Sequence, residues 1–449
     1  MTLPAILRRG APRFDAAYER LIWNKRLANA RSPAAVAAPR STAEVAALVR
    51  HAADNDLEIG LRSGGHNYEA SPLKSGGLLL DLGGLDTIEV DAQARTAWVG
   101  PGVLGGKLIA ELADHGLAFP IGHCPDVGLG GYLLSGGFGW NEAVWGPACF
   151  SVHEVELVLA SGELVRASEH EHADLFWAAR GAGCGFFAVA TRFRLALHDL
   201  PRAAFASTAA FTADSAPILA EWLSQASREA YRGAEITCMV GPHLKTGEPS
   251  IMLRADAVAD NHEEARSRIA PLLSPPPTAR RIGEPSEHFV DFAKLTRLSA
   301  MPGDKRVAAD HLWGDAPIGE LLLAVRHLAG IPDKASTINL FGLGGVGEVR
   351  HAPDERKYAL SVGGGIAAGI YAVWDDPAHD ARHLDWVAQA NAALAPFRAG
   401  RYVGEAALTT EPGRPEQCFT PAAFERIERL RATYDPKGLF GGFPRPERF

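Results

Sequence analysis

The stretch that decides the fold lies at residues 122–140 and reads GHCPDVGLGGYLLSGGFGW. Glycine fills eight of the 25 positions from 122 to 146, which is too many for an ordinary core helix or strand. The same stretch carries Leu, Tyr, Phe and Trp side chains, so it is too apolar for a flexible linker. We therefore expect a long ordered loop that lies against another part of the molecule or against a ligand.

Two further Gly-rich stretches accompany this loop, one on each side of it in the sequence. Arg62-Ser63-Gly64-Gly65-His66-Asn67 follows a predicted strand at 58–61, and Arg180-Gly181-Ala182-Gly183 precedes a predicted strand at 189–197. Successive glycines after a strand expose backbone N–H groups that can hold a pyrophosphate. The alternative for the first stretch is a tight turn with a solvated histidine.

Other phosphate and metal motifs are absent from the sequence. Gly105-Gly106-Lys107 is followed by Leu where a Walker loop needs Ser or Thr, and no GxGxxG opens a βαβ unit after a strand. There is no HExxH, and His170-Glu171-His172 lies in a polar stretch typical of a surface turn. We therefore expect neither a Rossmann nicotinamide site nor a metal site.

Charge and cysteine content narrow the function classes. The 449 residues carry 45 Lys and Arg against 53 Asp and Glu, a net charge of −8, which argues against a nucleic-acid-binding protein. The five cysteines form no CxxC pair, the N-terminus does not resemble a secretion signal, and no window is apolar enough to span a membrane. We expect a cytoplasmic protein with reduced thiols and no membrane partner.

Strands and helices alternate over the first 200 residues, and the pattern then changes. From 201 to about 400 we expect an α+β unit on a mostly antiparallel sheet. Its predicted helices are 217–231, 261–273, 318–329 and 379–394, and its predicted strands are 235–240, 251–256, 337–341 and 366–374. A last helix is expected at 421–433, with Thr420 as N-cap. The expected domains are 1–200, 201–400, and a segment at 401–449 that returns to the first.

Four motifs in this order give the sequence a family resemblance. RSGGH, CPxVGxGG with SGGFG, RGAG before a strand, and Tyr434-Asp435-Pro436-Lys437-Gly438-Leu439-Phe440 together resemble the berberine-bridge-enzyme-like, FAD-linked oxidoreductases of bacterial type. That family has the PCMH-type FAD-binding fold of vanillyl-alcohol oxidase. The resemblance implies an α+β protein in which a two-part FAD-binding domain faces a substrate domain built on an antiparallel sheet.

The resemblance also implies an FAD held by two covalent bonds. His66 stands where the family's histidine bonds the flavin 8α-methyl carbon, and Cys124 stands where its cysteine bonds flavin C6. The alternative for Cys124 is a small buried apolar residue. The remaining cofactor contacts implied are Arg62, Ser63, Gly64, Gly65, Asn67, Pro125, Val127, Gly128, Gly130, Gly131, Tyr132, Ser135, Gly136, Gly137, Gly139, Trp140, Gly185 and Val189.

The sequence departs from the family pattern at three places. Cys184 and Gly185 replace a common Pro-Asn after RGAG, and Phe150 replaces a common Asp after the Gly-rich loop. Gly441-Gly442-Phe443-Pro444 replaces the usual polar tail after YDPxxxF. We therefore expect the outer contacts of the flavin ring to differ from those of the family.

Two residues are candidates for the catalytic base. The family's base comes from a Tyr-x-Asn-Tyr pattern, and the aligned stretch is Tyr402-Val403-Gly404-Glu405. A Glu with a raised pKa or a Tyr with a lowered pKa would serve, so Tyr402 and Glu405 both stay open, beside the alternative that neither is the base. Tyr371 and Trp374 are expected pocket walls, with Phe341 and Trp313 as weaker candidates.

The function implied is two-electron oxidation of a small molecule at a C–H bond beside an alcohol or amine. FAD would accept the hydride, and O₂ would reoxidise it with release of H₂O₂. Three alternatives stay open: an oxidative cyclase, a dehydrogenase that excludes O₂, and a flavoprotein without turnover.

Overall fold

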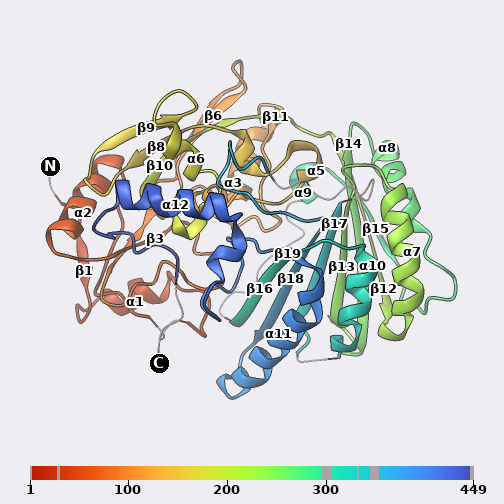
Figure 1. Ribbon diagram of the computed structural model, residues 1–449. Coiled ribbons are helices and arrows are strands. Elements are labelled where there is room, and N and C mark those ends of the chain that lie inside the picture. The colour runs from red at the N-terminus through yellow and green to blue at the C-terminus, as the bar shows by residue number, and fades with distance from the viewer. Residues whose placement is uncertain (1–2, 28–30, 296–304, 331–332, 344–352, 445–449) are drawn as a thin grey trace.

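The computed structural model describes residues 3–27, 31–295, 305–330, 333–343 and 353–444. Among the described residues before 200, two larger sheets accompany a small two-stranded ladder (Figure 1). The first has the order β1-β2-β4-β3 and the second β5-β6-β10-β8-β9. Their strands are β1 Ile6–Arg8, β2 Ala35–Ala37, β3 Ile59–Arg62, β4 Leu78–Asp81, β5 Ile88–Asp91, β6 Thr96–Val99, β8 Val152–Val158, β9 Leu164–Ser168 and β10 Val189–Ala196.

Helix α2 (Thr42–Asp54) illustrates how local sequence sets these elements. Its N-cap Ser41 accepts a hydrogen bond from the Glu44 N–H at 3.2 Å, which satisfies one of the free donors of the first turn. Val45, Leu48, Val49 and Ala52 lie on one face and are buried in the core. This half also contains α1 Phe14–Glu19, α3 Gly105–Ala113 and α6 Ala173–Ala178.

The second half is built on one antiparallel sheet of eight strands. Their order is β15-β12-β14-β13-β17-β18-β16-β19. Their bounds are β12 Ala203–Thr212, β13 Glu235–Pro242, β14 Pro249–Ala259, β15 Ser286–Val290, β16 Arg306–Gly314, β17 Thr337–Leu343, β18 Ile366–Trp374 and β19 Arg398–Gly400. The small ladder of β7 (Leu117–Ala118) and β11 (His198–Asp199) lies before it in the chain.

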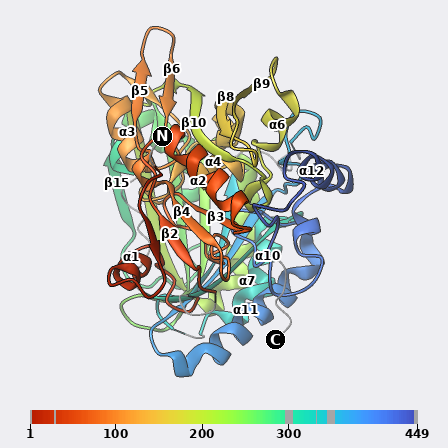
Figure 2. The ribbon, with the colours of Figure 1, turned by 90° about the vertical axis from the view of Figure 1, so that its left-hand side faces the viewer.

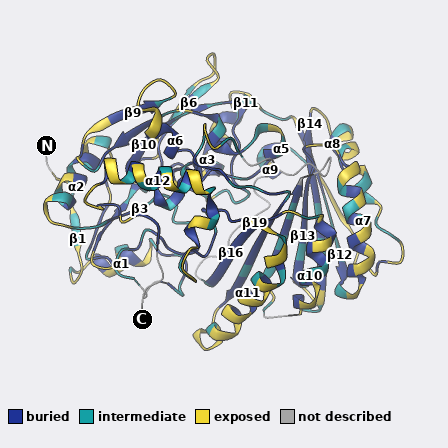
Figure 3. Ribbon diagram, in the orientation of Figure 1, coloured by how far each residue is buried: buried dark blue, intermediate teal, exposed yellow. Residues whose placement is uncertain are grey.

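Helices cover one face of this sheet and leave the other turned toward the first half (Figures 1 and 2). The covering helices are α7 (Ala216–Glu229), α8 (His262–Arg268), α10 (Ile318–Val325) and α11 (Asp380–Leu394), while α9 (Phe292–Leu295) lies at the edge near α3. Their inward faces and the strands beneath form one apolar core, and their outward faces are exposed (Figure 3). The α+β class expected from the sequence is confirmed.

Strands β12 and β16 were not expected. β12 reads AAFASTAAFT, and its small side chains give no clear two-residue alternation of apolar and polar character. β16 carries Asp310 and His311 in its middle, both buried, which breaks the apolar pattern. In both strands tertiary packing outweighs the local sequence signal.

The Gly-rich stretch at 122–146, expected to be a long ordered loop, is not a loop along its whole length. It contains two short helices, α4 (Leu129–Leu134) and α5 (Glu142–Trp145). Gly136 and Gly137 follow α4 with φ of 111° and 80°, a left-handed backbone that glycine adopts without strain.

The C-terminal segment returns to the first half, where helix α12 (Pro421–Tyr434) packs on α6. Both carboxylate oxygens of Asp435 accept backbone N–H groups, from Leu439 at 2.7 Å and Phe440 at 2.9 Å. The turn that results lets the Leu439 carbonyl accept the Ile59 N–H at the start of β3. The division into 1–200, 201–400 and 401–449 remains our proposal. Across the described ranges, no helix has the length and apolar character needed to cross a membrane.

Candidate active site

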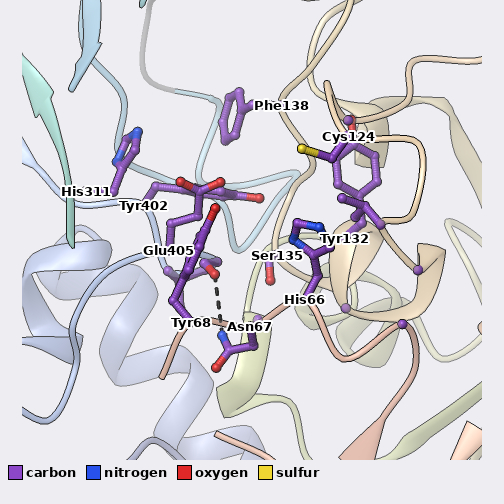
Figure 4. A pocket seen from close by; sticks show the side chains of 18 of the residues that line it. His66, Asn67, Tyr68, Cys124, Tyr132, Ser135, Phe138, His311, Tyr402 and Glu405 are labelled. Atoms are coloured by element: carbon purple, nitrogen blue, oxygen red, sulfur yellow. Dashed lines mark hydrogen bonds between the residues drawn. The ribbon is translucent and has the colours of Figure 1, made fainter. Parts of the chain in front are cut away.

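A cavity of about 550 Å³ lies between the Gly-rich loops of the first half and the open face of the eight-stranded sheet. Loop 62–68 and loop 122–140 line it on one side, and strands β13, β14, β17, β18 and β16 line it on the other. The segment 402–405 completes the wall. Figure 4 shows His66 and Cys124 on one side of this space and Glu405, Tyr402 and His311 on the other.

The two Gly-rich loops touch backbone to backbone at one end of the cavity. A Cβ on Gly64 would lie 2.5 Å from the Gly128 nitrogen, and one on Gly128 would lie 2.3 Å from the Gly64 nitrogen. The space beside Gly131 is open, because an added Cβ there would meet nothing within 4 Å. Only glycine permits this contact, and it leaves backbone exposed beside an open space.

Arg62 supports the first loop from behind. Its guanidinium binds Asp81 at 2.9 Å and the carbonyls of Ser63 and Gly64 at 2.8 and 3.2 Å. Within the described chain, no group accepts the backbone N–H of Gly64, Gly65 or His66. The carbonyls are thus satisfied by protein, and the N–H groups remain as donors for a bound anion.

His66 and Cys124 reach the cavity from the two loops. A ring nitrogen of His66, the Cys124 sulfur and a carboxylate oxygen of Asp126 all lie within 4.8 Å of one another. That spacing suits two bonds to neighbouring positions on the edge of one aromatic ring. Burial, together with the carboxylates of Asp126 and Glu405, raises the pKa of the Cys124 thiol to about 12.

Most of the predicted cofactor residues line the cavity, and five do not. Those that line it are Arg62, Ser63, Gly64, Gly65, His66, Asn67, Cys124, Val127, Gly128, Gly130, Gly131, Tyr132, Ser135, Gly139 and Trp140. Of the other five, Pro125 lies against Gly106, Gly136 against Leu360, Gly137 against Tyr132 and Gly185 against the Phe443 ring, and Val189 is buried in the core.

Glu405 extends into the cavity opposite His66 and Cys124 (Figure 4). Its carboxylate accepts a hydrogen bond from the Tyr371 hydroxyl at 2.6 Å. Burial raises the pKa of Glu405 above its ordinary value, and the Tyr371 hydrogen bond opposes part of that rise. Tyr68 packs on Tyr371 with ring centroids 5.5 Å apart, which makes this wall aromatic.

Tyr402, the other candidate base, is held differently. Its hydroxyl accepts the Gly137 N–H at 3.3 Å, and its ring packs edge-on against Phe138 at 4.8 Å. Burial raises the pKa of Tyr402 above its ordinary value, and the charge of Glu405 adds to the rise. A tyrosine base needs the opposite shift, so the geometry favours Glu405.

The buried Asp310 fixes the segment that carries both Tyr402 and Glu405. Asp310 on β16 accepts hydrogen bonds from Arg401 at 3.0 Å, from Arg414 at 2.6 Å and from the Ala407 N–H at 3.0 Å. Its side chain is only 1% exposed. These bonds tie residues on both sides of Glu405 to the sheet.

Sequence reasoning missed a polar cluster on the sheet wall. Arg254 binds Asp256 through two hydrogen bonds of 2.8 and 2.9 Å, and His123 pairs with Glu235. Burial raises the pKa of Asp256 to about 6, although Arg254 opposes the rise. Arg254 and Asp256 alternate on β14 with apolar neighbours, but this pattern alone does not show which face of the strand meets the cavity.

The expected pocket walls were correct for Tyr371 and wrong for Trp374. Tyr371, Phe341 and Trp313 line the cavity. Trp374 has the opposite parity on β18 and stacks on His383 at 4.4 Å, on the face that α11 covers. A two-residue period places these two aromatic side chains on opposite faces of the sheet.

Comparison with known proteins agrees with this geometry. The FAD binding domain family matches residues 33–168, which include both Gly-rich loops. The FAD-linked oxidoreductase nodO of Hypoxylon pulicicidum is 27% identical over 453 residues, covering 98% of this chain and 97% of that protein.

Two solved structures share the fold. One is 6-hydroxy-D-nicotine oxidase from Arthrobacter nicotinovorans, with a TM-score of 0.83, 24% identity and coverage of 98% and 97% of the two chains. The other is BBE-like 1 of Physcomitrella patens, with a TM-score of 0.84, 19% identity and coverage of 99% and 96%. The PCMH-type architecture expected from the sequence is confirmed.

FAD fits the residues present. The unpaired N–H groups of loop 64–66 and the open space at Gly131 suit a pyrophosphate, and His66 with Cys124 suits the edge of a flavin ring. The fold, the FAD binding domain at 33–168 and the similarity along the whole chain identify the protein as an FAD-dependent oxidoreductase.

Proposed function

We propose that the protein is an oxidase that removes hydride from a C–H bond beside an alcohol or amine of a small molecule. Bound FAD supplies the two-electron acceptor. The observation that carries the proposal is the position of Glu405, which lies in the cavity opposite His66 and Cys124 with a raised pKa. Its carboxylate can take the proton of the substrate O–H or N–H as the C–H bond breaks.

The surrounding residues orient the substrate. Tyr371 holds the Glu405 carboxylate through its 2.6 Å hydrogen bond, and the rings of Tyr68 and Trp313 exclude water from that side. Thr337 and Asn339 lie on the same sheet wall and offer polar groups to a substrate. The similarity in fold to a nicotine-derivative oxidase supports including cyclic amines beside alcohols and sugars in a substrate panel.

We further propose that FAD is attached through both His66 and Cys124. The support is the 4.8 Å cluster at the cavity edge and the family resemblance of the two motifs. Acid precipitation of the purified protein tests this directly. We expect the yellow colour to stay with the pellet and peptide mass mapping to find flavin on both residues. Flavin released into the supernatant would contradict the attachment.

Glu405→Gln tests the base. With a substrate from the panel under anaerobic conditions, we expect flavin reduction to slow by about 10²- to 10⁴-fold while FAD content stays unchanged. Glu425→Gln on the exposed face of α12 is the matched control and should reduce at the normal rate. Normal reduction by Glu405→Gln would place the base elsewhere.

Electron transfer to O₂ is part of the proposal and has its own test. H₂O₂ release in step with substrate oxidation supports the oxidase. Reduction without H₂O₂ release supports the dehydrogenase, and a ring-closed product supports the cyclase. Flavin that no panel member reduces supports the binding-only flavoprotein. Cytoplasmic location and bacterial origin stay expectations.

A further inference from the structure

The side chain of Asp126 lies at the covalent attachment site without lining the cavity. Its carboxylate belongs to the cluster with His66 and Cys124, but Asp126 lies on the outer side of loop 122–140 and is 54% exposed. The loop holds it there, because Val127 donates its N–H to the Cys124 carbonyl at 3.3 Å. The resemblance gives Asp126 no role, and neither does the proposed oxidation.

Asp126 faces one specific nitrogen of His66. His66 Nε2 is buried without a hydrogen-bond partner among the described residues, and it lies in ionic contact with Asp126 Oδ1 at 3.3 Å. The contact with His66 lowers the pKa of Asp126, so the carboxylate is ionised at neutral pH. A negative charge beside Nε2 favours the imidazole tautomer that carries its proton there and keeps its lone pair on Nδ1. Nδ1 is then the nucleophilic nitrogen.

We propose that Asp126 is the positioning residue that prepares His66 for covalent attachment of FAD. Asp126 fixes the Nε2–H tautomer and receives the Nε2 proton as the bond at Nδ1 forms. This inference rests on the proposed covalent attachment.

The chemistry balances with O₂ as oxidant. One C–H bond of the flavin 8α-methyl group and the Nε2–H bond of His66 break, and one C–N bond at Nδ1 forms. Two protons and two electrons leave; Asp126 takes the ring proton, solvent takes the other, and O₂ is reduced to H₂O₂. Cys124 needs a thiolate for its own bond, and the charge of Asp126 opposes thiolate formation. Asp126 therefore favours the bond to His66 and disfavours the bond to Cys124.

The test follows bond formation in time. Full-length apoprotein from riboflavin-starved cells is mixed with FAD in air, and samples are quenched in acid and mapped by peptide mass. In the Cys124→Ala background, we expect Asp126→Asn to slow attachment at His66 by about 100-fold or more. In the His66→Ala background, Asp126→Asn should speed attachment at Cys124.

Three controls separate the outcomes. Asp86→Asn removes an exposed carboxylate that pairs with Lys107 at 2.6 Å, and it should change neither rate. Asp126→Glu should restore much of the His66 rate, and Asp126→Ser gives a second substitution at this half-exposed position. Equal rates of attachment at His66 for the parent, Asp126→Asn and Asp126→Ser would overturn the inference and leave the covalent attachment standing. No attachment at His66 in the unmodified protein would overturn both.

Discussion

At the scale of single residues, the hydrogen bond from Tyr371 acts on the pKa of Glu405, the proposed base. Burial raises the pKa of Glu405, and Tyr371 lowers it through the 2.6 Å hydrogen bond. Because the base must be ionised, the rate of flavin reduction should rise with pH through a midpoint above that of an ordinary glutamate. At mildly acidic pH, where an exposed glutamate is still ionised, the rate should already be low.

Tyr371→Phe removes the opposing hydrogen bond, so the pKa of Glu405 should rise further. We expect the midpoint of the pH–rate profile to move to higher pH in this variant, measured by anaerobic stopped-flow reduction. Tyr231→Phe changes an exposed tyrosine outside the cavity and should leave the profile in place. A midpoint that moves down or stays would show that Tyr371 does not act on the base.

The two proposed attachment residues give a second prediction at this scale. His66→Ala and Cys124→Ala should each leave one covalent bond, because the two side chains reach the cavity from separate loops. Mass mapping and a shifted visible spectrum would report the loss. FAD that stays doubly attached in either variant would show that the missing bond comes from another residue.

At the scale of elements, Asp310 on strand β16 holds the segment 401–414, which carries the proposed base Glu405. Asp310→Asn keeps the shape but leaves two buried arginines, Arg401 and Arg414, without their shared carboxylate. Breaking a buried pair from one side costs about 3–5 kcal/mol of unfolding free energy. Urea unfolding should show this loss. Asp174→Asn, which breaks the exposed pair with Arg426, should cost less than about 1 kcal/mol.

Sequence predicted elements well where one element carries its own signal. The capped, amphipathic α2 and the helix N-cap at Thr420 could be located from local spacing alone. Strands β12 and β16 could not, because β12 is rich in alanine and β16 buries Asp310, whose partners lie some 90 residues or more away in the chain.

The candidate site was predictable to a similar degree. His66, Cys124 and their glycines belong to short motifs of fixed spacing. They could therefore be located in the sequence through the family resemblance of those motifs. The Glu235–His123 and Arg254–Asp256 pairs could not, because their role depends on which face of β13 and β14 meets the cavity. The choice between Tyr402 and Glu405 likewise needed the contacts of their side chains.

At the scale of the whole molecule, the cavity lies between the two halves, so its occupant should hold them together. A ligand that binds only the folded state raises stability in proportion to the logarithm of its free concentration over its Kd. We expect loaded protein to melt well above apoprotein in scanning calorimetry. If both bonds form, the melting temperature should not change on dialysis against buffer without FAD.

The double variant His66→Ala, Cys124→Ala is the control for this prediction. It should bind FAD without a covalent bond, so its melting temperature should rise with added FAD and fall on dialysis. Equal melting temperatures for the FAD-loaded protein and the apoprotein would mean that bound FAD does not stabilise the contact between the two halves.

The contact between Gly64 and Gly128 also limits how this protein can change over generations. Each glycine occupies the space that a side chain on the other would need, at 2.5 and 2.3 Å. A second mutation at one position cannot rescue a first mutation at the other. We therefore expect both positions to stay glycine during evolution. New substrate ranges should instead arise on the opposite wall, where Thr237, Met239 and Asn339 line the cavity. A directed-evolution library should therefore hold the two glycines constant and diversify these three positions.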